Sequence, residues 1–307
     1  MRHIERAHAK LNLLLAVQPC IVDGKHLLTS VFLNIGLHDT LTFDFEAGSS
    51  LSSEAVSYEF VTALQVGIFD CALENNMVVK AVRLFLETFG AKAIPAKQLH
   101  ILLDKQIPLQ AGLGGGSSDA AAVLRMLTRL ANMQPTMPAL IKLAQRLGAD
   151  VPFFLHGGCA HMGGFGDELI ECLPVPQLDL VLVKPAQGIS TKELYQSFDR
   201  DFGARSTPIP DSAPLVAALR EGSSRQVLSD AMANNLEPAA IKLLNEIAII
   251  KQELEEAPGV LRALVTGSGS TVFGVCENAA TAQQVAKDMA DQGYWSCVTS
   301  SINSEVS

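Results

Sequence analysis

The stretch PLQAGLGGGSSDAAAVL, residues 108–124, places four glycines within five positions directly before a segment with helical spacing of apolar residues. The first N–H groups of a helix have no partner within the helix, and the helix dipole puts roughly half a positive charge there. Glycines before such a helix let backbone N–H groups approach phosphate oxygens. The stretch therefore predicts an anion site. The alternative is a tight turn with Ser117 or Ser118 as an ordinary N-cap.

Spacing excludes two common phosphate-binding sequences at this loop. A P-loop requires GxxxxGK[ST], but the residue five positions after Gly112 is Ser117, and no lysine follows it. The dinucleotide fingerprint GxGxxG, started at Gly112 or at Gly114, would need its last glycine at Ser117 or at Asp119. The loop is therefore expected to bind phosphate in another way.

Further stretches resemble a known family in their order along the chain. They are AHAKLNLLLAV (7–17), GADVPFFLHGG (148–158), GISTKELYQSF (188–198), NNLEPAA (234–240) and TGSGSTVFGV (266–275). Together with the glycine loop they are similar to motifs of the GHMP kinases, the family of galactokinase, homoserine kinase, mevalonate kinase and phosphomevalonate kinase. The resemblance implies an ATP-dependent kinase with an alcohol group as acceptor. It also implies a two-domain GHMP kinase fold with the active site in the cleft between the domains.

The resemblance implies two catalytic side chains, Asp150 and Lys10. Asp150 would accept the proton of the attacking hydroxyl, and the charge of Lys10 would keep Asp150 ionised and steady the γ-phosphate. Because Pro152 resists helix formation, we expect Asp150 to lie on a loop. The alternatives are an aspartate that only caps the next turn and a lysine that points to solvent. Asn12 shares a strand face with Lys10 and either positions the substrate or is a hydrogen-bonded core residue.

The resemblance also implies ATP and Mg²⁺ as cofactors. The residues expected around the ATP phosphates are Pro108, Ala111, Gly112, Leu113, Gly114, Gly115, Gly116, Ser117 and Ser118. Ser118 is the expected hydroxyl on the Mg²⁺ side, whereas Asp119 is interpreted as a carboxylate stabilised by the helix dipole. Lys105 and Asn76 either line the adenine side or are solvated surface residues.

At the acceptor end, the resemblance is greatest to a branch of the family that phosphorylates the 2-hydroxyl of a cytidine diphosphate-linked methylerythritol. That reaction belongs to non-mevalonate isoprenoid biosynthesis. In this branch the first strand is followed by DGYH, whose tyrosine stacks on cytosine and whose histidine bonds to it. Here the sequence is DGKH, with Lys25 before His26. Thr191 and Tyr195 match a second substrate contact and a second stacking aromatic.

The third glycine motif is expected to close over the phosphate end of the acceptor, through Gly267, Ser268 and Gly269. Lys25 is the departure from the family pattern. Its stem could lie along the base, or its ammonium could contact a diphosphate. The departure leaves open a second hypothesis, a kinase of the same type with a different alcohol acceptor.

Composition limits the partners and the compartment. The net charge is −9 with no Lys/Arg-rich run, so nucleic acid is not an expected partner. Apolar stretches stay short of the ~20 residues that span a bilayer, so no membrane association is expected. Six cysteines without CxxC spacing indicate a reducing, cytoplasmic compartment. We expect a monomer or a homodimer that binds a small-molecule substrate.

The elements that must position these residues follow from apolar periodicity. Strands are expected at 7–17, 98–108 and 178–185, on both sides of the glycine turn in 261–276, and at 30–47, which alternates as hairpin strands do. Helices are expected at 76–90, 117–133, 138–147 and 188–198, and a loop at 201–224. Strands and helices do not alternate strictly, so the expected class is α+β. We place the domains at 1–160, with the ATP loop and the base, and at 161–307, with the substrate side and the third glycine motif.

Overall fold

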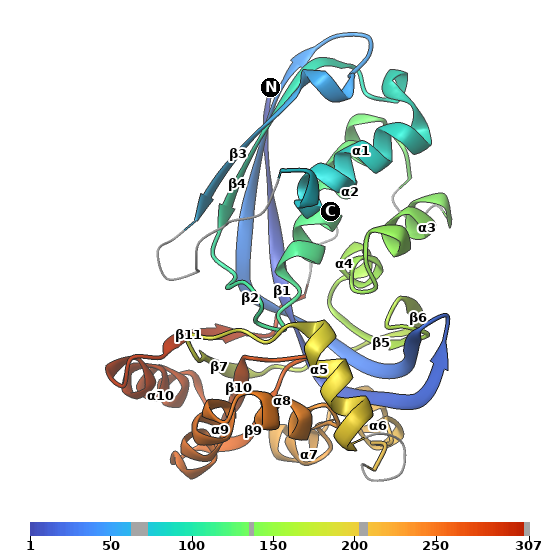
Figure 1. The fold of residues 1–307 in the computed structure, drawn as a ribbon. Helices are drawn as coiled ribbons and strands as arrows, with labels where there is room; N and C mark the ends of the chain where they lie inside the picture. Colours follow the sequence, from blue (N-terminus) through green and yellow to red (C-terminus); the bar gives the residue numbers. More distant parts are fainter. Residues whose placement is uncertain (63–72, 135–137, 203–207, 304–307) are drawn as a thin grey trace.

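The computed structural model of the chain contains two mainly antiparallel sheets, each with helices on one side (Figure 1). The structure describes residues 1–62, 73–134, 138–202 and 208–303. The larger sheet has seven strands: β1 (Arg2–Val22), β2 (Lys25–Ala47), β3 (Val56–Thr62), β4 (Ala96–Lys105), β5 (Cys159–Gly163), β6 (Glu168–Leu173) and β8 (Ala233–Asn234). The smaller sheet has four: β7 (Asp179–Lys184), β9 (Val260–Val265), β10 (Val272–Cys276) and β11 (Trp295–Ser300).

The helices divide between the two sheets. Beside the larger sheet lie α1 (Met77–Phe89), α2 (Gly115–Leu130), α3 (Pro138–Leu147) and α4 (Val151–His156), with short helical turns at Ser53–Ala55, Leu73–Asn75 and Ala91–Ala93. The second half of the chain contributes α5 (Thr191–Ser197), a π-helical turn (Phe198–Phe202), α6 (Ala213–Glu221), α7 (Arg225–Asp230), α8 (Glu237–Leu243), α9 (Glu246–Glu256) and α10 (Ala279–Asp291). The expected α+β class is confirmed.

The hairpin of β1 and β2 is the longest feature and reaches from the top of the larger sheet down beside the smaller one (Figure 1). Its turn is Asp23-Gly24, with φ of 50° and 75° at the two residues, the backbone that a two-residue hairpin turn requires. Residues 30–47, expected as hairpin strands, lie in the single strand β2, which pairs with β1, β4 and β5. Their alternation reflects the burial of one face rather than a turn inside the segment.

Three helix predictions need correction. The helix expected from residue 117 begins at Gly115, so two of the loop glycines are helical. Pro152 does not prevent a helix, because it occupies the first turn of α4, where a missing N–H costs nothing. The loop expected at 201–224 contains α6, whose apolar side chains are buried, including Leu215, Val216 and Leu219; residues 203–207 lie outside the described residues. The Pro, Ser and Gly content concealed this short amphipathic pattern.

Three apolar clusters form the core. The first lies between the larger sheet and α1–α4. The second joins the two sheets face to face through residues such as Leu11, Leu33, Leu180 and Leu264. The third covers the other face of the smaller sheet with α8, α9 and α10. Because the second cluster is shared, the position of one sheet determines the position of the other.

The expected boundary near residue 160 falls inside β5. β5 pairs with both β2 and β6, so the larger sheet continues to Leu173. The smaller sheet begins at Asp179, and β8 later returns to pair with β1 at Leu14 and Leu15. The chain therefore crosses between the two sheets more than once, and both contribute to the region where they meet.

Candidate active site

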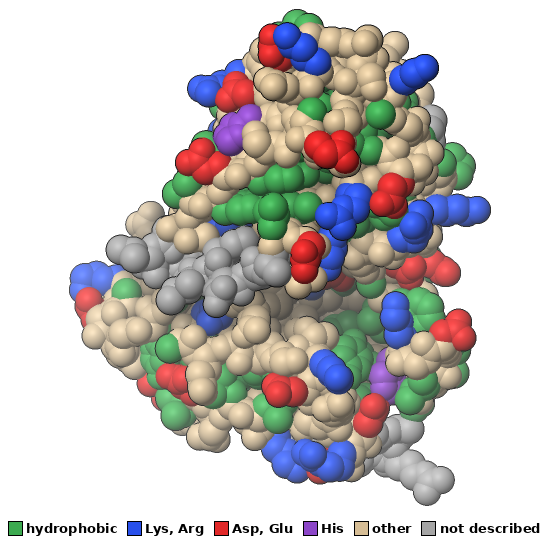
Figure 2. Space-filling model, turned by 45° about the horizontal axis from the view of Figure 1, so that its top comes forward, with side chains coloured by type: hydrophobic (Ala, Val, Ile, Leu, Met, Phe, Trp, Pro, Cys, Tyr) green, Lys and Arg blue, Asp and Glu red, His purple; other side chains and the backbone are tan. Residues whose placement is uncertain are grey.

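A cavity of about 1150 Å³ lies where the two parts of the molecule meet. Figure 2 shows this level as a hollow between the upper and lower parts of the molecule. Its walls come from the β1–β2 hairpin, the glycine loop before α2, the segment before α4, α5, and the turn after β9. On the face in Figure 2, Lys and Arg are interspersed with Asp and Glu.

Lys10 and Asp150 meet in this cavity. Lys10 Nζ lies 3.5 Å from Asp150 Oδ2, and the lysine side chain is only 5% exposed, whereas the carboxylate is 31% exposed. Lys10 Nζ also donates to Asn12 Oδ1 at 2.6 Å, and Asn12 Nδ2 donates to Ser30 Oγ at 2.8 Å. The ammonium is thus held from one side by protein groups. The solvent-pointing alternative for Lys10 is wrong.

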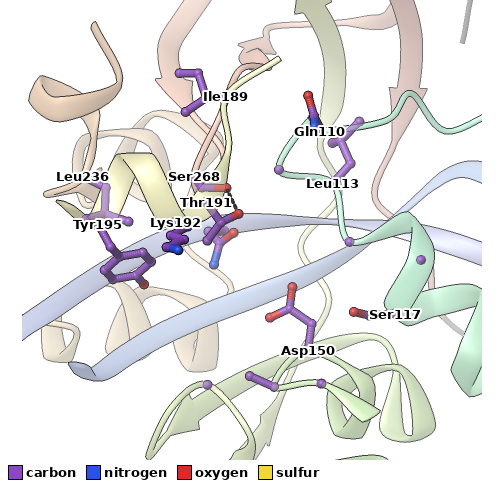
Figure 3. A pocket seen from close by; sticks show the side chains of 18 of the residues that line it. Gln110, Leu113, Ser117, Asp150, Ile189, Thr191, Lys192, Tyr195, Leu236 and Ser268 are labelled. Atoms are coloured by element: carbon purple, nitrogen blue, oxygen red, sulfur yellow. Dashed lines mark hydrogen bonds between the residues drawn. The ribbon is translucent and has the colours of Figure 1, made fainter. Parts of the chain in front are cut away.

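Asp150 occupies the residue before α4, in a short turn in which Val151 N donates to Gly148 O. Its side chain makes no capping hydrogen bond, which removes the capping alternative. Figure 3 shows the carboxylate directed into the pocket, with Ser117 on one side and Tyr195 on the other. A partly exposed carboxylate beside a buried ammonium is placed where it can accept a proton from a bound hydroxyl.

The glycine loop is packed tightly against other parts of the protein. A Cβ at Gly112, whose φ is +73°, would lie 2.2 Å from Thr266 O in the turn after β9. A Cβ at Gly114, whose φ is +72°, would lie 2.9 Å from the Phe154 ring. Lys10 N donates to Leu113 O at 3.0 Å, which ties the loop to β1. These glycines are therefore required by the protein's own packing, in addition to any approach to phosphate.

The predicted phosphate residues separate into two groups. Those that line the cavity are Pro108, Ala111, Gly112, Leu113, Gly114, Gly115, Gly116 and Ser117. Ser118 is not among the lining residues and is 1% exposed. Asn76 is also absent from the lining; it caps α1 by accepting from Val78 N and is buried, so its surface alternative is wrong.

Lys105 is buried beneath the loop instead of solvated, so the surface alternative is wrong for it as well. Its Nζ pairs with Asp39 and, at 2.9 Å, with Asp119 Oδ2. Asp39 Oδ1 accepts from the N–H groups of Gln106 and Ile107, at the start of the loop. Burial, together with the nearby Asp39, raises the pKa of Asp119 to about 8 in spite of Lys105. The triad Asp39–Lys105–Asp119 therefore joins β2, β4 and α2 below the phosphate loop.

At the far end of the cavity, His26 lies over Tyr195 with ring centroids 5.5 Å apart. Its Nδ1 is 2.8 Å from Gln18 O, and its Nε2 is 2.8 Å from Asp199 Oδ1. Both ring nitrogens therefore have protein partners. Burial raises the pKa of Tyr195 to about 12, so its hydroxyl stays protonated and can donate.

The third glycine motif contacts α5 at the wall of the cavity. Thr191 Oγ1 and Ser268 Oγ are 3.1 Å apart, as the dashed line in Figure 3 marks. Gly267 and Ser268 line the cavity, whereas Gly269 is not among the lining residues. The N–H of Gly269 donates to Thr266 O at 2.9 Å and shapes the turn from inside.

The sequence interpretation missed Phe165. It lies in a tight turn between β5 and β6, where Gly166 N donates to Gly163 O at 2.9 Å. The Lys25 ammonium lies 5.6 Å from the centroid of its ring, and both side chains line the cavity. An aromatic residue between glycines in GGFGD was the available signal. It could not be assigned, because its distance from Lys25 is set only by the fold.

Family profiles match both halves of the chain. The profile described as GHMP kinases N terminal domain matches residues 76–158, and the one described as GHMP kinases C terminal matches residues 215–294. A 4-diphosphocytidyl-2-C-methyl-D-erythritol kinase of Desulfitobacterium hafniense (strain Y51) is 36% identical over 95% of this chain and 93% of its own. The chain belongs to the GHMP kinase family. A kinase of the same name from Pelotomaculum thermopropionicum is 39% identical over 91% of both chains.

Solved structures agree with this GHMP kinase in fold. A crystal structure of 4-(cytidine 5'-diphospho)-2C-methyl-D-erythritol kinase has a TM-score of 0.75 and 30% identity, and covers 98% of this chain and 100% of its own. Homoserine kinase from Cytophaga hutchinsonii has a TM-score of 0.70 at 20% identity, covering 98% of this chain and 94% of its own, and supports the fold alone. This GHMP kinase is accordingly an ATP-dependent kinase.

Two features are absent from the described part of this GHMP kinase. Within it, none of the helices is both long and apolar enough to cross a membrane. Among the same residues, no group of three or more His, Cys, Asp or Glu side chains is arranged to hold a metal ion.

Replacement of Gly112 by alanine should test the contact between the two glycine loops. We expect Gly112→Ala to lower the free energy of unfolding by about 2–4 kcal/mol, because strain and a clash with Thr266 O add together. Gly222→Ala is the matched control, since Gly222 also has positive φ (64°) but has no neighbouring atom within 4 Å of the added Cβ. Urea denaturation measures both variants. Equal losses would contradict the proposed contact.

The buried triad predicts unequal tolerance at its two carboxylates. Asp119→Asn keeps a neutral, hydrogen-bonding group and should cost about 1 kcal/mol. Asp39→Asn should cost about 3 kcal/mol or more, because Asp39 accepts from two backbone N–H groups and Lys105. Urea denaturation at pH ~7 of both variants measures these losses. If Asp119→Asn proved as damaging as Asp39→Asn, the interpretation of Asp119 as the protonated carboxyl group of the triad would be wrong.

The difference in stability between wild type and Asp119→Asn should depend on pH. The folded protein holds a proton on Asp119 up to about pH 8, whereas the unfolded chain releases it above the ordinary pKa of 3.8. The unfolded state therefore binds fewer protons in this window, and wild-type stability through this group falls as pH rises. Asp119→Asn should remove that part of the slope between pH ~5 and ~8, while groups unchanged by the substitution cancel in the comparison.

Proposed function

We propose that this GHMP kinase transfers the γ-phosphoryl group of ATP to the 2-hydroxyl of 4-(cytidine 5'-diphospho)-2-C-methyl-D-erythritol, in non-mevalonate isoprenoid precursor biosynthesis. The observation that carries the proposal is the Asp150 carboxylate, 3.5 Å from Lys10 Nζ, in a cavity that has the glycine loop at one end and aromatic side chains at the other. The curated relatives that match nearly the whole chain bear the name of this kinase, which supports it over other acceptors.

In the proposed reaction the acceptor oxygen bonds to the γ-phosphorus, its proton passes to Asp150, and the bond from phosphorus to the bridging oxygen of ADP breaks. Such transfers depend mainly on positioning and on neutralising the phosphate charge. Lys10 supplies a fixed positive charge beside Asp150, held by Asn12. Asp150 is therefore assigned as the general base, Lys10 as the charge partner, and Asn12 as the side chain that holds Lys10.

The ATP end of the site is assigned to the loop and to the start of α2. Backbone N–H groups of Gly115, Gly116 and Ser117 are at the N-terminus of a 16-residue helix, where they favour phosphate. The family resemblance pointed to Ser118 for the Mg²⁺ side, but burial makes its neighbour Ser117 the better candidate. Mg²⁺ commonly keeps phosphate oxygens and waters as ligands. The Ser117 hydroxyl is an oxygen donor of the type that would suit it.

The acceptor end is assigned to two aromatic side chains. Tyr195 and Phe165 both line this part of the cavity, and the Lys25 ammonium lies over the Phe165 ring. Phe165 can supply the stacking surface that the residue at position 25 no longer provides. His26 completes the pocket beside Tyr195 and is already oriented by Gln18 and Asp199. These features support recognition of a cytidine base without a tyrosine at position 25.

The remaining assignments concern compartment and assembly. The five cysteines in the described part of the chain are free thiols: Cys20, Cys159, Cys172, Cys276 and Cys297. Free thiols suit the reducing cytoplasm that we expect for this enzyme. A monomer or a homodimer, acting on a small molecule without nucleic acid, stays our prediction.

Purified protein with ATP and Mg²⁺ should release ADP with the cytidine diphosphate-linked methylerythritol as acceptor. A cytidine-free methylerythritol phosphate should give no turnover above background. Asp150→Asn should lower kcat by about 100-fold or more with its melting temperature retained, because it removes the base. Turnover of other small alcohols but not of the cytidylated acceptor would favour the second hypothesis, a changed acceptor site at Lys25.

The role of Phe165 should appear in the acceptor KM. Phe165→Leu keeps apolar volume but removes the aromatic face, and stacking on one face contributes ~1–3 kcal/mol. We therefore expect the KM for the cytidylated acceptor to rise about fivefold or more, with the KM for ATP unchanged. Phe60→Leu, in strand β3, which does not line the cavity, is the control and should change neither constant. Unchanged acceptor KM in Phe165→Leu would exclude a contact with the base.

A further inference from the structure

The segment NNLEPAA, residues 234–240, joins β8 to α8 and has so far been given no part in the reaction. Its polar side chains bond to backbone groups of other segments. Asn234 and Glu237 both bond to the end of β9, and Asn235 bonds to β1. The segment therefore fastens the smaller sheet to the long hairpin at the level of the cavity.

Both the nitrogen and the oxygen of the Asn234 side-chain amide form hydrogen bonds with backbone groups. Its Nδ2 donates to Val265 O at 2.8 Å and to Gly267 O at 2.9 Å, and its Oδ1 accepts from Leu236 N at 2.9 Å. The side chain is buried, so these bonds do not compete with bulk water. Both carbonyls belong to the point where β9 ends and the third glycine turn begins. One amide thus determines the direction in which the turn leaves the sheet.

The backbone of Gly267, which Asn234 holds, lies directly beside side chains assigned to the reaction. A Cβ placed at Gly267 would lie 3.3 Å from Lys10 Nζ, 3.2 Å from Asn12 Oδ1 and 3.0 Å from Gly112 O. The backbone at Gly267 is therefore packed directly beside the ammonium that pairs with Asp150. The next residue, Ser268, lines the cavity and lies 3.1 Å from Thr191 Oγ1. A shift of the Gly267 carbonyl would move both features.

We infer that Asn234 is a positioning residue for phosphoryl transfer, which acts through Gly267 on Lys10 and Ser268. Asn234 is not among the residues that line the cavity, so it touches neither substrate directly. Its amide holds the third glycine turn at the distance from Lys10 that the reaction requires. The inference rests on the proposed kinase reaction.

The neighbouring Asn235 provides a matched control. It is also buried, its Oδ1 accepts from Val17 N at 2.9 Å, and its Nδ2 donates to Val17 O at 2.9 Å. These bonds hold β1 at a residue that is not among those lining the cavity. The two asparagines therefore have similar structural roles, but only Asn234 bonds to the glycine turn.

Asn234→Asp and Asn235→Asp should be compared in the full chain. An aspartate cannot donate to the two carbonyls, so we expect kcat of Asn234→Asp to fall about 10- to 100-fold, the scale of a small misplacement in an active site. The kcat of Asn235→Asp should stay near wild type at a similar loss of melting temperature. Asn234→Ser, which lacks the reach for both bonds and adds no charge, should show the same fall if the aspartate variant does not fold.

Hydrogen–deuterium exchange of the free protein gives a second readout that needs no acceptor. The backbone amides of residues 265–271 should exchange faster in Asn234→Asp or Asn234→Ser than in Asn235→Asp. Wild-type kcat in a folded Asn234 variant, or activity losses at both asparagines that simply follow melting temperature, would overturn the inference. If wild-type protein did not turn over the cytidylated acceptor, the proposed function would fail. The exchange comparison would then still decide the inference, with equal exchange in all variants overturning it.

Discussion

The contact between the two glycine loops is the constraint on which the site depends. Gly112, in the loop before α2, approaches Thr266 O so closely that a Cβ would lie 2.2 Å from it. The same turn is bonded to Gln110 O and Ala111 O through the N–H groups of Ser270 and Thr271. The loop expected to hold the ATP phosphates is therefore in direct contact with the loop expected to hold the acceptor. Because interiors are close-packed, movement of one loop must displace the other.

Two groups of ion pairs lie near the phosphate loop, one in the cavity around Lys10 and one beneath the loop around Lys105. In the cavity, Lys10 faces Asp150 and is held by Asn12, so a positive charge is available where the proposed reaction must neutralise phosphate charge. Below the loop, Lys105 is paired with both Asp39 and Asp119, although it also lines the cavity. Two lysines close to one phosphate loop thus have different roles. In the proposed reaction one acts on the reacting groups, whereas the other stabilises the start of the loop and of α2.

At the proposed acceptor end, the chain departs from the family pattern at position 25. Position 25 carries lysine, and its ammonium lies over Phe165, a ring contributed by the turn between β5 and β6. Stacking needs only a flat aromatic surface at the right place and is indifferent to the segment that supplies it. Tyr195 and His26 are stacked on each other and line the same cavity. The substitution at position 25 is therefore compatible with an unchanged class of acceptor.

Local patterns in the sequence were sufficient for the α+β class and for helices α1, α2 and α3, because these depend on periodicity. Helices α9 and α10 were not predicted. The motif residues Lys10 and Asp150 were also identified from the sequence. Their meeting at 3.5 Å was decided only by tertiary structure, as was the burial of Lys105 and Ser118. Phe165 and Asn234 escaped sequence reasoning for the same reason. Their partners lie 140 and 33 residues away along the chain, at Lys25 and Gly267, and a contact over such a separation exists only once both sheets have packed.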